Sequence, residues 1–67
     1  MNKVAQTLRE LRVERHMTQR EFASLLGVSE KTISNYEIAK RSPGIEFLIR
    51  VSKTFNVTLD YLTRGIK

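Results

Sequence analysis

The chain has 67 residues, of which 40% are hydrophobic, with no cysteine and a single histidine. A chain this short buries only about 60% of the surface that its unfolded form exposes, which argues against a second domain and a large catalytic pocket. The absence of cysteine excludes disulfides, and one histidine alone cannot complete the usual zinc sites. The formal net charge of +5 favours a polyanionic partner, although net charge describes association rather than fold.

The first predicted helix carries apolar residues at Val4, Leu8 and Leu11, which is the i, i+4, i+7 spacing of a buried helix face. We expect this helix to end at His16, because histidine is enriched among the non-glycine residues that adopt the left-handed conformation. His16 is therefore interpreted as a helix terminator rather than as a ligand or a catalytic base.

The second predicted helix begins after Thr18, which has the spacing of a capping box with Glu21. Met17 and Phe22 occupy the two positions of a hydrophobic staple around this cap. Gly27 suits the left-handed conformation that ends a helix, so the second helix is only about two turns long.

The third predicted helix begins after Ser29, a favoured N-cap residue. Its inward residues are Ile33 and Tyr36. The residues left facing outward are Glu30, Lys31, Thr32 and Asn35. Two short helices joined by a glycine-containing turn, over about residues 18–37, match the helix-turn-helix unit.

A basic loop follows, with Lys40 and Arg41 and a Pro-Gly turn at Pro43. The fourth helix is predicted over residues 45–55, with Asn56 at its end. Its buried residues are predicted to be Leu48, Val51 and Phe55. The fifth helix is predicted to begin after Thr58, to bury Leu59 and Leu62, and to end at Gly65.

Several short motifs at fixed spacing give the chain a recognisable pattern. They are Thr18-Gln19-x-Glu21-x-Ala23, Gly27-Val28-Ser29 and Ile33-Ser34-x-Tyr36-Glu37. With them the chain resembles the phage-repressor-like, or XRE/Cro-type, helix-turn-helix DNA-binding proteins over nearly its whole length. The resemblance implies an all-α fold: a single, compact five-helix lambda-repressor-like DNA-binding domain over residues 1–67, with the helix-turn-helix at helices 2 and 3.

The resemblance also implies roles for individual residues. Gln19 is expected to anchor to a DNA phosphate and to brace the recognition helix, and Arg12 is expected to form a structural pair with Glu37. Lys40 and Arg41 match the family loop that meets phosphates. The base-facing positions are Glu30, Lys31, Thr32 and Asn35. Of these, Lys31 suits guanine, Asn35 suits adenine and Glu30 suits the cytosine amino group. A phosphate contact for Lys31 and a purely helix-stabilising role for Glu30 remain open.

Two positions depart from the family pattern. The family usually has glycine two residues after the residue matched by Glu37, whereas this chain has Ala39, so we expect the third helix to run slightly longer. The family's polar cap after Pro43 is replaced by Gly44, which supplies no side-chain acceptor.

The sequence therefore predicts a cytoplasmic, sequence-specific double-stranded DNA-binding transcriptional regulator, a repressor, acting as a homodimer. The expected dimer surface comprises Phe47, Tyr61 and Ile66. No apolar run approaches the ~20 residues of a membrane span, and no catalysis, metal, cofactor or small-molecule effector is expected. The alternative is an antitoxin-like protein or a protein-interaction module that uses the same scaffold to bind a partner protein.

Overall fold

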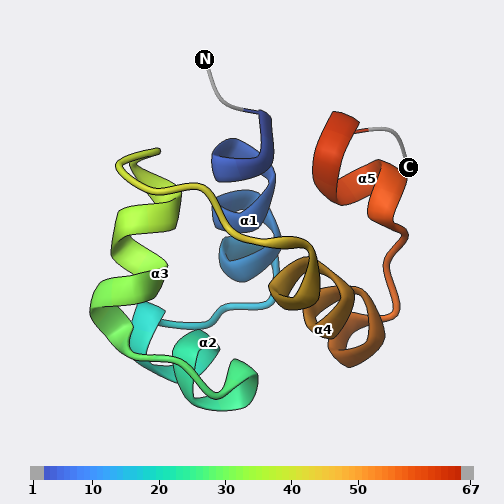
Figure 1. The fold of residues 1–67 in the computed structure, drawn as a ribbon. Coiled ribbons are helices and arrows are strands. Elements are labelled where there is room, and N and C mark those ends of the chain that lie inside the picture. The colour runs from blue at the N-terminus through green and yellow to red at the C-terminus, as the bar shows by residue number, and fades with distance from the viewer. Residues whose placement is uncertain (1–2, 66–67) are drawn as a thin grey trace.

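Five helices make up the computed structural model, which describes residues 3–65 (Figure 1). They are α1 (Lys3–Glu14), α2 (Gln19–Leu26), α3 (Glu30–Glu37), α4 (Ile45–Phe55) and α5 (Leu59–Arg64). The central helix α1 packs against α3 and α5, while α2 packs against α3 and α4, and α4 against α5. The described segment contains no strand, and none of its helices is long and apolar enough to cross a membrane.

The predicted N-caps begin three of these helices. Thr18 Oγ1 accepts from the Glu21 N–H at 3.0 Å, and the Thr18 N–H donates to Glu21 Oε1 at 2.9 Å, which completes the capping box of α2. Ser29 accepts from the Thr32 N–H at 3.1 Å at the start of α3, and Thr58 caps α5 in the same way. Gly44 precedes α4 without a side-chain cap, as its lack of a side chain dictates.

All five helices end at a residue in the left-handed conformation. These residues are His16 (φ 58°), Gly27 (φ 73°), Ala39 (φ 60°), Asn56 (φ 56°) and Gly65 (φ 72°). The sequence predicted four of these ends. Ala39 is the exception, because alanine bears a Cβ that crowds the backbone in this region.

The expectation of a longer third helix is wrong, because α3 ends at Glu37 and the chain turns immediately. The Ala39 N–H donates to the Tyr36 carbonyl at 3.2 Å and the Lys40 N–H to the Asn35 carbonyl at 2.9 Å, which is the pattern of a Schellman motif. These two hydrogen bonds to carbonyls of the last turn of α3 thus hold alanine in a conformation that usually takes glycine.

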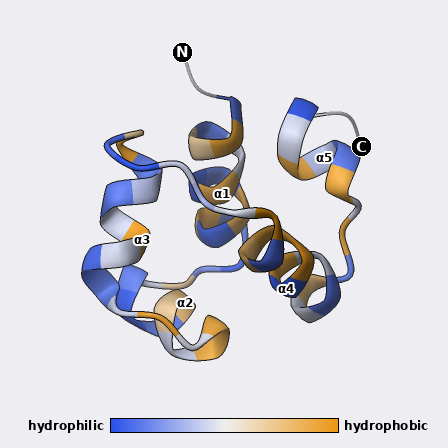
Figure 2. Ribbon diagram, in the orientation of Figure 1, coloured by the Kyte–Doolittle hydropathy of each residue, from blue (hydrophilic) through white to orange (hydrophobic). Residues whose placement is uncertain are grey.

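A single apolar core lies between the helices. Its fully buried members include Leu8 and Leu11 of α1, Phe22 and Leu26 of α2, Ile33 of α3, Val51 of α4 and Leu62 of α5. The rings of Phe22 and Phe55 stack with centroids 5.2 Å apart, which joins α2 to α4. In contrast to α4, α3 is mostly hydrophilic along its length (Figure 2). Ile33 is the one buried residue of α3.

Burial at the C-terminal end differs from the prediction. Leu59 was expected to be buried but is 38% exposed, whereas Tyr61 and Phe47, expected on a dimer surface, are only 6% and 8% exposed. The short helix α5 packs on both α1 and α4, so its covered face centres on Tyr61 and Leu62 and leaves its first residue outside. Phe47 meets the ring of Tyr36 edge-on at 5.0 Å and so joins α4 to α3. The third predicted dimer residue, Ile66, lies outside the described residues.

Candidate nucleic-acid interface

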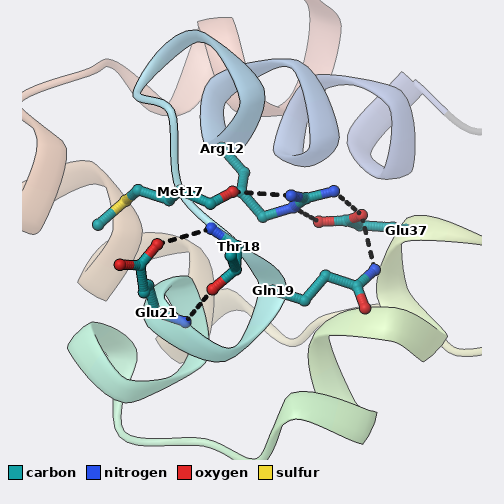
Figure 3. Close-up of polar contacts among 6 residues, drawn as sticks. All are labelled: Arg12, Met17, Thr18, Gln19, Glu21 and Glu37. Carbon is teal, nitrogen blue, oxygen red and sulfur yellow. Dashed lines mark hydrogen bonds and ion pairs between the residues drawn. The ribbon is translucent and has the colours of Figure 1, made fainter.

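The end of α3 is locked to α1 by a two-bond ion pair. Arg12 Nε donates to Glu37 Oε2 at 2.7 Å and Arg12 Nη2 donates to Glu37 Oε1 at 3.1 Å (Figure 3). The Arg12 and Glu37 side chains are only 14% and 3% exposed, so this is a largely desolvated pair. These hydrogen bonds raise the pKa of Arg12 above its ordinary value, against the opposing effect of burial. The pair predicted from the sequence is therefore present.

The same pair also holds α2. Arg12 Nη1 donates to the carbonyl of Met17 at 2.8 Å, in the segment between α1 and α2. Gln19 Nε2 donates to Glu37 Oε1 at 3.1 Å, from the first residue of α2 (Figure 3). The Glu37 carboxylate thus accepts hydrogen bonds from two other helices, and it fixes α3 relative to both.

The outward face of α3 carries the four residues predicted from the sequence. Glu30 and Lys31 are exposed, while Thr32 and Asn35 are half-buried at the edge of this face. Ile33 is buried beneath them. Two of these four side chains make contacts within the fold. The Thr32 and Ser29 hydroxyl oxygens lie 2.9 Å apart, and the Glu30 carboxylate lies 3.6 Å from Arg20 Nε. Within residues 3–65, no hydrogen bond or ion pair engages the side chains of Lys31 and Asn35.

The basic loop leaves the same end of α3 that Gln19 contacts. Ala39 turns the chain, and the side chains of Lys40 and Arg41 that follow are exposed. The Arg41 N–H reaches back to the Asn35 carbonyl at 3.3 Å, which keeps the start of the loop against α3. Two exposed cations therefore lie beside the end of α3 rather than on a detached segment.

Other arginines are engaged in holding helices together. Arg15 donates to the backbone carbonyl of Phe55 at 3.1 Å, and its guanidinium carbon lies 5.3 Å from the centroid of the Phe55 ring. Arg50 donates to the carbonyl of Leu26 at 2.8 Å, at the end of α2. Both arginines satisfy carbonyls that the helix ends leave unpaired. The net charge of the chain therefore overstates the charge that is free to meet a partner.

Comparisons with known proteins agree with this geometry. A protein-family model described as Helix-turn-helix matches residues 8–62. The uncharacterized HTH-type transcriptional regulator YqaE of Bacillus subtilis (strain 168) is 33% identical over 61 residues, which cover 91% of this chain and 53% of YqaE. The HTH-type transcriptional activator BcrR of Enterococcus faecalis is 41% identical over 58 residues, which cover 87% of this chain and 28% of BcrR. This chain thus spans about half of YqaE and less than a third of BcrR.

A solved structure matches over the full fold. The P22 c2 repressor protein, crystallised in complex with a synthetic operator, superposes with a TM-score of 0.87 at 27% sequence identity. The match covers 98% of this chain and 100% of the repressor chain. It confirms the predicted five-helix, phage-repressor-like fold.

Proposed function

This chain belongs to the helix-turn-helix family, and from that membership we propose that it is a transcriptional regulator that binds double-stranded DNA sequence-specifically. The observation that carries the proposal is α3 itself. Its outward face is polar, its inward face is anchored by Ile33, and its last residue is fixed by the largely desolvated Arg12–Glu37 pair. Such a rigid polar helix can enter the major groove, which admits one α-helix.

The base contacts come from the outward face of α3. The free ammonium of Lys31 suits the O6 and N7 acceptors of guanine, and the amide of Asn35 suits the N6 and N7 groups of adenine. Thr32 sits between them and can meet a base or a thymine methyl group. The carboxylate of Glu30 suits the cytosine amino group by its chemistry, but it already lies 3.6 Å from Arg20 Nε.

The phosphate contacts come from the flanks of α3. Gln19 opens α2, where unpaired backbone N–H groups and the helix dipole favour an anion. Lys40 and Arg41 lie in the loop that leaves α3 at the end contacted by Gln19. Each phosphate that they neutralise adds to the salt dependence of binding but not to sequence preference.

The regulator acts as a homodimer, because one recognition helix reads only a few base pairs. Two copies on a palindrome would place their recognition helices in half-sites about 34–36 Å apart. We propose that it represses transcription, as the name of the superposed P22 c2 repressor suggests, and that it works in the cytoplasm without catalysing a reaction. Transcription in vitro from a promoter that carries the selected site tests whether the protein represses or activates. Repression predicts fewer transcripts, and more transcripts would indicate an activator.

Selection of bound duplexes from a random pool, near physiological salt, tests the proposal. Enrichment of a palindrome with half-sites one helical turn apart is the expected result, and it would give the operator and the dimer together. A pool that shows no enrichment would overturn the proposal and favour a protein-binding role for the same scaffold.

A further inference from the structure

We propose that Arg20 is a specificity-determining residue that reads a guanine, held in position by Glu30. The inference rests on the proposed DNA binding and adds to it a residue of α2 that the sequence analysis did not assign. Its basis is a charged contact between the first turns of the two helices of the helix-turn-helix.

The contact joins α2 to the first residue of the recognition helix. Arg20 Nε lies 3.6 Å from Glu30 Oε1, and the two side chains are 85% and 51% exposed. An ion pair this exposed contributes little to stability, so stabilisation does not account for it. The contact orients the Arg20 side chain, because it draws the guanidinium toward the first residue of α3, where the outward face of that helix begins.

The contact leaves the two terminal nitrogens of the Arg20 guanidinium free to donate. Glu30 faces Nε, and the terminal nitrogens Nη1 and Nη2 make no hydrogen bond within residues 3–65. By contrast, Arg12, Arg15 and Arg50 each donate terminal nitrogens to a carbonyl or carboxylate of the fold. Arg20 is therefore an arginine of the helix-turn-helix whose Nη1 and Nη2 groups, a fork of N–H donors, can donate to a binding partner.

Guanine is the partner that fits this fork. Two parallel N–H donors match the O6 and N7 acceptors of guanine in the major groove, which is the commonest specific contact of arginine. A carboxylate behind the guanidinium restricts its rotation and so lowers the entropy lost on binding. Glu30 then acts as a positioning residue for Arg20, and its carboxylate serves the arginine instead of a cytosine.

Four variants test the assignment: Arg20→Ala, Arg20→Lys, Glu30→Gln and the control Arg64→Ala. Arg64 is also an exposed arginine beside a carboxylate, with Nη2 3.2 Å from Asp60 Oδ1, but it lies on α5. Each variant is titrated by fluorescence anisotropy against the duplex selected by the parent chain and against its single-base-pair substitutions. Circular dichroism first establishes that each variant is folded.

Arg20→Ala is expected to lose about 10- to 100-fold of discrimination at one G·C pair and to keep the other preferences. Arg20→Lys restores little of it, because an ammonium lacks the fork. Glu30→Gln weakens discrimination at the same pair, whereas Arg64→Ala leaves every preference unchanged.

Three results would overturn the assignment. A uniform loss of affinity for all duplexes in Arg20→Ala, recovered by Arg20→Lys, would make Arg20 a phosphate contact. A changed preference at a different base pair in Glu30→Gln would make Glu30 a base reader in its own right. Unchanged preferences in Arg20→Ala would remove Arg20 from recognition. Failure of DNA binding altogether is distinct, because the parent chain would then select no duplex.

Discussion

Gln19 and Arg20 are adjacent in the sequence, yet their side chains contact opposite ends of α3. Gln19 Nε2 donates to Glu37, the last residue of α3, at 3.1 Å, while Arg20 Nε lies 3.6 Å from Glu30, the first residue. Because a helix of this length extends for about 12 Å, the first turn of α2 lies across α3 and reaches both of its ends. The orientation of α3 is thereby set by α2 as well as by the pair with α1.

Removing Arg12 tests the lock at the end of α3. Arg12→Ala is expected to lower the free energy of unfolding by about 3–5 kcal/mol, because it leaves the buried Glu37 carboxylate without its charged partner. Urea unfolding followed by circular dichroism measures this, with Arg9→Ala on the exposed face of α1 as the control. The pKa of Arg12 in the folded chain is raised above its ordinary value, so Arg12 is charged at every pH below that ordinary value. The expected loss of stability in Arg12→Ala is therefore the same throughout the neutral range. Equal stability of the two variants would contradict the lock.

Replacing Ala39 tests the turn after α3. Ala39→Gly is expected to raise the free energy of unfolding by about 0.5–1 kcal/mol, since glycine adopts a positive φ without the Cβ penalty. Gly27→Ala is the matched reverse change, and it should lower stability although its new Cβ would meet Arg50 Nη1 at an ordinary 3.5 Å. Thermal unfolding should show opposite shifts of the midpoint. Destabilisation by both changes would mean that Ala39 is not strained.

Removing the hydroxyl of Thr18 tests the capping box of α2. Thr18→Ala is expected to cost about 1–2 kcal/mol, because the Glu21 N–H loses its acceptor at the helix start. Thr54→Ala, at an exposed position inside α4, makes the same chemical change without a cap and should be neutral or slightly stabilising. Chemical unfolding of the two variants side by side gives the difference, and no difference would refute the role of the box.

Replacing Lys40 tests the loop after α3. Lys40→Ala should weaken binding to every duplex alike and reduce the slope of log K against log salt by about 0.9 for one lost phosphate contact. The control Lys53→Ala removes the same charge from the far end of α4, away from the loop. Titrations at several salt concentrations measure both slopes. A loss confined to one base pair would instead make Lys40 a base contact.

The sequence was a good guide wherever a local signal determines the structure. The N-caps Thr18, Ser29 and Thr58 and the helix ends at His16, Gly27, Asn56 and Gly65 all depend on residues next to them, and the structure has them as predicted. Ala39 was missed because two backbone hydrogen bonds override the preference of its side chain. Tyr61 and Leu59 were misplaced because the face that α5 buries depends on where α1 and α4 lie.

The same distinction applies to the site. The Arg12–Glu37 pair joins residues far apart in the sequence and was predicted only through the family resemblance. The ion pair between Arg20 and Glu30 carried no such signal, since it depends on the crossing of α2 over α3. The DNA contacts assigned to Gln19, Glu30, Lys31, Thr32, Asn35, Lys40 and Arg41 stay predictions.

Whether the outward face of α3 reads bases is tested most directly by Asn35→Ala. The variant and the parent chain are titrated against the selected duplex and its single-base-pair substitutions, with Lys31→Ala measured in parallel. Our account predicts that Asn35→Ala loses about 1–3 kcal/mol of discrimination at one A·T pair and that Lys31→Ala loses a similar amount at a G·C pair. An Asn35→Ala variant that binds every duplex as tightly as the parent, with the same preferences, would contradict it.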